Sequence, residues 1–322
     1  MNRRRTALLV ALLATVGALA AGCASSPSHD GRLSIVTSTN VWGDVAAQVG
    51  GDLVDVTSIV SDPSADPHSY EASARVQLTL SKADLVVVNG GGYDDYATTM
   101  LNGLTTRPPS IEAVAVFGTV HGTTPADDAD FNEHVWYDLP TVAAVADEVA
   151  ADLGRIDPAH ADTYTANAAA FTGTVHALVS RTQTLAQTVG GRGVAVTEPV
   201  PGYLLDALGL VDKTPPRFST AIEDETDVPP TVMRDTLALL TDHQVALLVY
   251  NAQTTGPQTA QVRTAARDAG VPVVAVTETL PAGKTYATWM SANLDALAQA
   301  LGVEPTTPDL AAPGTPAPGG TP

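Results

Sequence analysis

The stretch from Asp157 to Gly191 carries the longest regular pattern in the sequence. Apolar residues recur along it at the spacing of one helix face, and they are Tyr164, Ala168, Phe171, Val175, Leu178, Leu185 and Val189. Thr182 is the polar exception on that face. Asp157 suits the N-cap of a helix, Pro158 suits its first position, and Gly190-Gly191 provides a stop. About thirty helical residues span about 45 Å, which is enough to cross a small domain. The pattern predicts one rigid helix over 157–190 that joins two lobes, with an ordinary long surface helix as the alternative.

Short apolar runs alternate with short helical patterns on both sides of this helix. The apolar runs lie at 33–38, 54–60, 84–89, 193–197, 244–250 and 271–276. Runs that are continuously apolar are typical of strands buried on both faces of a parallel sheet. We therefore predict an α/β fold with two lobes, 33–156 and 191–303, each a mostly parallel sheet flanked by helices. The segment 304–322 is rich in proline and is expected to be disordered.

The N-terminal sequence resembles a bacterial export signal. Three arginines precede an apolar run of about fifteen residues, which is short for a transmembrane helix. The run ends in Ala20-Ala21-Gly22-Cys23, which resembles a lipobox with Ala20 in the place of the usual leucine. We expect a signal peptide over 1–22, lipidation of Cys23 and a tether over 23–32, so that the protein is extracytoplasmic and anchored to the membrane. An ordinary secretory signal is the alternative.

Charge and cysteine content exclude several classes of function. The formal net charge is −19, and removal of the three arginines before Cys23 leaves about −22. So acidic a chain is not expected to bind nucleic acid. Because Cys23 is the only cysteine, an internal disulfide, a zinc ribbon and an iron–sulfur site are excluded.

Two predicted strands of the second lobe end in the same pair of residues. Thr197-Glu198 and Thr277-Glu278 each follow an apolar run, and each precedes a loop that contains proline. Parallel strands of one sheet deliver their carboxyl ends to one edge, where such sheets bind ligands. The first lobe offers His68 and His134 in loops. Two imidazoles and two carboxylates are a donor set suited to a divalent transition metal.

Three segments resemble a known family. Asp66-Pro-His-Ser-Tyr-Glu71, His134-Val-Trp-Tyr-Asp138 and Thr197-Glu198-Pro199 are similar to the ligand segments of metal-binding lipoproteins of bacterial ABC importers, the zinc/manganese cluster (A-I) of solute-binding proteins. The resemblance runs from about residue 33 to 303. It implies metal capture between the lobes by His68, His134, Glu198 and Glu278, and delivery to a cognate ABC permease with its cytoplasmic ATPase. Glu278 stands where the family usually has aspartate. We expect a monomer.

The identity of the metal stays open at this stage. Zinc-type members of the family carry a third histidine ligand and a long His-rich loop, whereas the corresponding loop here has only His121 among aspartates. The resemblance therefore favours Mn²⁺ or Fe²⁺, although the affinity order favours Zn²⁺ at almost any such site. Asp138 either braces a ligand imidazole or caps the helix that opens at Pro140. The remaining histidines are assigned to the tether or to helix surfaces: His29, His160, His176 and His243.

Two other function classes compete with metal capture. One is a lipid-anchored metal-dependent hydrolase with Glu198 or Glu278 as general base, although the sequence has no HExxH, no GxSxG and no cysteine nucleophile. The other is an adhesin or scaffold in which any metal is structural. Metal capture by a solute-binding protein, which is not an enzyme, is the function we predict.

Overall fold

The computed structural model describes residues 31–62, 70, 73–125 and 131–304. The chain divides into two units, Met1–Arg32 and Leu33–Pro322. The predicted signal peptide, Cys23, His29, His68 and the predicted tail from 305 onward lie outside the described residues. Within the described residues, none of the helices combines the length and the apolar character that a membrane crossing requires. The domain limits given above stay predictions.

The first sheet has four parallel strands in the order β2-β1-β3-β4. Ile35 of β1 pairs with Val56 on one side and with Leu85 on the other. The strands are β1 (Leu33–Thr39), β2 (Val54–Val60), β3 (Leu85–Val88) and β4 (Ser110–Glu112). The sequence did not predict β4, because an edge strand of three residues, of which only Ile111 is buried, leaves almost no pattern.

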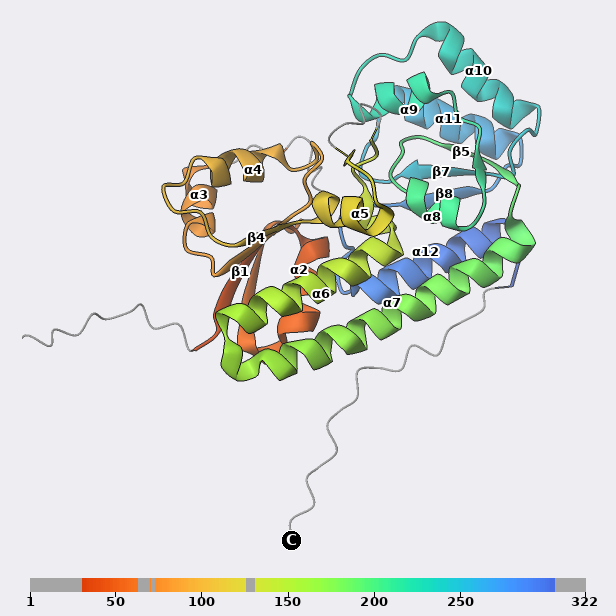
Figure 1. The fold of residues 1–322 in the computed structure, drawn as a ribbon. Coiled ribbons are helices and arrows are strands. Elements are labelled where there is room, and N and C mark those ends of the chain that lie inside the picture. The colour runs from red at the N-terminus through yellow and green to blue at the C-terminus, as the bar shows by residue number, and fades with distance from the viewer. Residues whose placement is uncertain (1–30, 63–69, 71–72, 126–130, 305–322) are drawn as a thin grey trace, which may run out of the picture. The chain divides into compact units, whose positions relative to one another are not determined.

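Helices flank this sheet, and after its last strand the chain continues in further helices (Figure 1). The helices of this lobe are α2 (Asn40–Gly50), α3 (Ala74–Leu80), α4 (Asp95–Asn102), α5 (Ala113–His121) and α6 (Leu139–Ile156), with short 3-10 turns η1 (Gly51–Leu53) and η3 (Val135–Tyr137). Helix α5 extends into the segment that the sequence suggested was an acidic loop. The glycines 90–92 all have positive φ, so the chain turns tightly as it leaves β3.

The second sheet repeats the order of the first. It has four parallel strands in the order β6-β5-β7-β8, which are β5 (Gly193–Val196), β6 (Val211–Asp212), β7 (Leu247–Asn251) and β8 (Val273–Val276). Its helices are α8 (Gly202–Ala207), α9 (Pro216–Glu223), α10 (Pro230–Thr241), α11 (Pro257–Asp268) and α12 (Tyr286–Ala300). The fold class predicted from the sequence is confirmed. Between β6 and α10 lies α9, which packs through Phe218, Ala221 and Ile222.

Helix α7 (Ala161–Val189) joins the two lobes, as predicted (Figure 1). All eight residues of the predicted stripe are buried, and Arg181 is buried beside them. Asn167 of α7 donates to the carbonyl of Val49 in α2, and Arg181 donates to Ser291 in α12. Because its two halves are bound to helices of different lobes, α7 supports both.

The start of α7 differs from the sequence prediction. A 3-10 turn, η4 (Pro158–His160), precedes the α-helix, so Asp157 lies before this turn and not directly before α7. The Asp157 carboxylate accepts hydrogen bonds from Nδ1 of His160 at 2.6 Å and from the hydroxyl of Tyr164 at 3.0 Å.

Hydrogen bonds also connect the lobes directly. The amide of Asn40, the first residue of α2, donates to the carbonyl of Leu280 and accepts from its N–H, both at 2.9 Å. The hydroxyl of Tyr137 donates to the carbonyl of Thr277 at 2.8 Å. These contacts fix the segment that follows β8, which carries Glu278, against the first lobe.

Candidate metal centre

Glu198 and Glu278 lie at the same edge of the second sheet. Glu198 follows β5 and Glu278 follows β8, and β7 lies between these strands. Asn251, the last residue of β7, donates from Nδ2 to Oε2 of Glu198 at 2.8 Å and to Oε1 of Glu278 at 2.6 Å. The residues Glu198 and Glu278 are 4% and 1% exposed. The predicted convergence of the two Thr-Glu strand ends is therefore observed.

A second amide holds the loop of Glu278. Oε1 of Gln253 accepts the backbone N–H groups of Glu278 and Thr279, and Nε2 of Gln253 donates to the hydroxyl of Thr279. The backbone of Glu278 is fixed by these bonds, and its side chain is fixed by Asn251. A preorganised carboxylate of this kind loses little freedom when it binds a cation.

His134 is contributed by the first lobe and is fully buried. Its Nδ1 lies 2.7 Å from Oδ1 of Asn132, an oxygen that also accepts the backbone N–H of His134. Because an amide oxygen only accepts, Nδ1 carries the proton of the neutral ring, and Nε2 is the nitrogen with a lone pair. Metal-binding histidines are commonly oriented in this way by an acceptor on the second nitrogen.

Asn132 also connects His134 to the lobe that carries Glu198. Its Nδ2 donates to the carbonyl of Pro199 at 3.0 Å, and its own carbonyl accepts the hydroxyl of Tyr203. One side chain therefore orients the imidazole and contacts the residue next to Glu198. Sequence analysis missed Asn132, although its position two residues before a predicted ligand was a usable signal.

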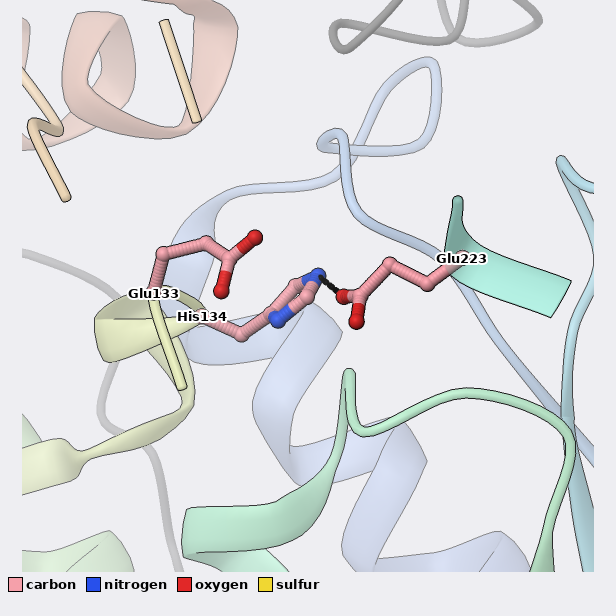
Figure 2. Close-up of side chains that lie close together, drawn as sticks. All are labelled: Glu133, His134 and Glu223. Atoms are coloured by element: carbon pink, nitrogen blue, oxygen red, sulfur yellow. Dashed lines mark ion pairs between the residues drawn. The ribbon is translucent and has the colours of Figure 1, made fainter. Parts of the chain in front are cut away.

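Glu223 also faces His134, and sequence analysis did not predict it. It is the last residue of α9, and its Oε1 lies 3.8 Å from Nε2 of His134. Figure 2 shows the Glu223 carboxylate directed at the imidazole from one side, with Glu133 on the other. Ligand atoms of Glu133, His134 and Glu223 all lie within 4.8 Å of one another.

Glu223 lies close enough to the predicted carboxylate ligands for their charges to shift its pKa. Burial, together with the negative charges of Glu133, Glu198 and Glu278, raises the pKa of Glu223 to about 9. Burial also raises the pKa of Glu133. A carboxyl whose pKa is raised by neighbouring carboxylates lies in a site of negative potential, which attracts a cation.

The structure thus brings three of the four predicted ligands to one region: His134, Glu198 and Glu278. The fourth, His68, lies outside the described residues. One imidazole nitrogen and several carboxylate oxygens fit a divalent transition ion, because imidazole suits zinc, iron and nickel and carboxylate suits manganese.

Asp138 and the other histidines that the structure describes have different partners or lie exposed. Oδ1 of Asp138 accepts the backbone N–H of Thr141 at 2.9 Å and so caps α6, and it also lies 3.1 Å from Nε2 of His121. The sequence left Asp138 with two explanations, and in the structure it caps the helix while Asn132 orients His134. His160, His176 and His243 are exposed, as expected.

Comparison with known proteins also points to a metal-binding protein. The family model described as zinc-uptake complex component A periplasmic matches residues 35–300. The chain is 30% identical to the manganese-binding lipoprotein MntA of Halalkalibacterium halodurans over 164 residues, which are 50% of this chain and 53% of that one. It is 26% identical to the metal ABC transporter substrate-binding lipoprotein FimA of Streptococcus parasanguinis over 310 residues, 92% of this chain and 97% of that one.

The fold is also that of a solved protein. The periplasmic zinc binding protein TroA of Treponema pallidum superposes with a TM-score of 0.70 at 20% identity, and the match covers 84% of this chain and 99% of that one. At this identity the match establishes the two-lobed architecture alone.

Proposed function

Because this chain belongs to the family of zinc-uptake complex component A periplasmic proteins, we propose that it captures one divalent transition metal ion between its lobes for an ABC permease. Members of this family are solute-binding proteins that work with an ABC permease and its ATPase, and they are not enzymes. The hydrolase alternative therefore has no support. The proposed ligands are His68, His134, Glu198 and Glu278.

The observation that carries this proposal is the bridge made by Asn251. One amide holds both predicted carboxylates at one sheet edge, at distances of 2.6 and 2.8 Å. The donors come from opposite lobes, with His134 on one lobe and Glu198 and Glu278 on the other. An ion bound by these donors would therefore bridge the two lobes.

The cargo we propose is Mn²⁺ or Zn²⁺, with Fe²⁺ as a further candidate. Curated relatives of this chain carry the name manganese-binding lipoprotein, and a protein of the same fold is named a zinc binding protein. Imidazole and carboxylate donors accept all three ions. Because the imidazoles must be neutral to bind, capture is expected to weaken below about pH 6.

We also propose that Cys23 is lipidated and anchors the protein to the outer face of the membrane as a monomer. The relatives from Halalkalibacterium halodurans and Streptococcus parasanguinis are both named lipoproteins. Metabolic labelling with a radiolabelled fatty acid tests this point, since Cys23→Ser removes the only thiol that can carry the acyl chain.

Metal stoichiometry tests the ligand set. The full chain is stripped with a chelator, reloaded separately with Mn²⁺ and Zn²⁺, desalted and measured by elemental analysis. We expect one ion per chain, and a loss of stoichiometric metal in His68→Ala and in His134→Ala. His176→Ala, an exposed histidine on α7, is the matched control and should retain the ion. Full metal content in both ligand variants would contradict the proposed site.

A further inference from the structure

Glu223 lies in a position that neither the sequence resemblance nor the predicted ligand set includes. It ends α9, a helix anchored by Phe218 and Ile222, which are 0% and 7% exposed. The packed helix fixes the backbone of Glu223, and the side chain extends from there toward the imidazole of the opposite lobe (Figure 2). Its position is therefore set by the fold rather than by a free surface rotamer.

The distance between Glu223 and His134 suits a shared ion better than a direct bond. Oε1 of Glu223 and Nε2 of His134 are 3.8 Å apart, which is beyond hydrogen-bond length. Two donors that each bind one ion at about 2.0–2.2 Å can be separated by up to about 4 Å. An ion between these two atoms satisfies both bond lengths.

The carboxylate oxygen of Glu223 is also a buried polar atom. Among the residues that the structure describes, none donates a hydrogen bond to Oε1 of Glu223. Buried polar atoms in proteins are nearly always satisfied by a hydrogen bond, a water or an ion. A cation next to Nε2 of His134 would satisfy this oxygen.

From this geometry we propose that Glu223 is a further ligand of the captured ion, and that its carboxylate makes the site prefer Mn²⁺ to Zn²⁺. The inference rests on the function proposed above. Zinc in proteins is most often bound by four ligands, chiefly thiolates and imidazoles. A further carboxylate oxygen beside those of Glu198 and Glu278 favours an ion with a larger coordination number and a preference for oxygen, which is Mn²⁺.

The test is the ratio of Mn²⁺ to Zn²⁺ affinity in Glu223→Gln, measured by competition titration on the chelator-stripped full chain. The amide preserves the shape of the side chain and removes the charge. We expect Mn²⁺ affinity to fall about tenfold or more, with a much smaller change for Zn²⁺. X-ray absorption of the Mn²⁺-loaded protein should show one oxygen donor fewer in the variant than in the wild type.

Two comparison variants make the result specific. Glu133→Gln removes the other acid beside His134 and tests whether that carboxylate, rather than Glu223, sets the Mn²⁺ to Zn²⁺ ratio. Glu148→Gln removes the same charge from an exposed position on α6 and should change neither affinity. Thermal unfolding of each metal-free variant identifies any loss of fold.

The outcomes separate this inference from the proposed function. If the wild type binds one ion, His134→Ala loses it and Glu223→Gln keeps the wild-type ratio and donor count, the role of Glu223 is overturned and the site stands. If Glu133→Gln rather than Glu223→Gln lowers the ratio, the inference is equally overturned. If the wild type binds no stoichiometric ion, the proposed function itself fails.

Discussion

The amide nitrogen of Asn251 lies 2.6 Å from a carboxylate oxygen of Glu278. The same nitrogen lies 2.8 Å from Glu198, so a neutral side chain on the central strand holds two acids that would otherwise repel each other. The carboxylate pair is therefore assembled without an ion. Its assembly depends on residues that are not ligands, and several of the predictions below change those residues.

Asn251→Asp should destabilise the metal-free protein by about 3 kcal/mol, because it removes hydrogen bonds to charged groups and adds a third carboxylate at a buried position. Asn251 is 1% exposed, so solvent screens little of this effect. Denaturant unfolding in a chelator should show the loss, and added Mn²⁺ should recover part of it. Asn102→Asp, at an exposed position, is the control. Equal unfolding midpoints for Asn251→Asp and the wild type would contradict the bridging role.

Asn132→Ala should lower metal affinity about 10- to 100-fold, because His134 loses the acceptor that selects its tautomer. Asn132→Asp keeps an oxygen near Nδ1 but cannot donate to the carbonyl of Pro199, so its loss should be smaller. Calorimetric titration of both variants with Zn²⁺ measures the difference. The account is wrong on this point if the alanine variant binds as tightly as the wild type.

Asn40→Ala should destabilise the fold by about 1–3 kcal/mol, because both backbone groups of Leu280 lose their partner at a buried position. Asn40→Asp retains the acceptor for the N–H of Leu280 but loses the donor, and it should fall between alanine and wild type. Urea unfolding provides the comparison. An order in which the aspartate variant is the least stable would show that charge, rather than the paired bonds, dominates there.

Arg181→Ala should cost roughly 3 kcal/mol, because Arg181 is buried on α7 and binds Ser291 and Asp295 of α12. Asp295 keeps access to water, so the cost lies at the low end of the range for buried pairs. Arg181→Met fills the same space with an apolar chain and should be more stable than the alanine variant. Differential scanning calorimetry ranks the two, and the reverse ranking would contradict this explanation.

Residues that belong to a local periodic pattern could be predicted from the sequence. The stripe on α7 follows a helical repeat, and every residue assigned to it is buried. The two Thr-Glu strand ends could be paired because each follows a continuous apolar run and parallel strands share one edge. Arg181 was missed because a charged residue normally faces solvent, and its partner lies 114 positions away.

Glu223 illustrates the opposite case. It opens the run Glu223-Asp224-Glu225 at the end of a short helix, and such a run usually marks a solvated helix end. Its approach to His134 depends on how two lobes pack, which no local pattern encodes. Asn251 was predictable in principle, because it ends a strand at the same edge as Glu198 and Glu278.

The stability contributed by Asp157 should depend on pH. The hydrogen bond from His160 lowers the pKa of Asp157 in the folded protein. A carboxyl with a lowered folded-state pKa stabilises the fold above its unfolded value of about 3.9, and this contribution is lost as pH falls through the folded value.

Asp157→Asn should therefore have a lower Tm than the wild type at pH 7, and the difference should shrink as pH falls below about 4. Asp147→Asn, an exposed position on α6, should show no such trend. A difference in Tm that stays constant from pH 7 to pH 3 would contradict the assignment.

The most direct test of the central claim is a crystal structure of the Mn²⁺-loaded protein with anomalous diffraction to locate the ion. The account predicts one anomalous peak between the lobes, within bonding distance of Nε2 of His134 and of carboxylate oxygens of Glu198 and Glu278, with His68 as a further ligand. A peak bound elsewhere, or an ion that contacts only one lobe, would contradict it.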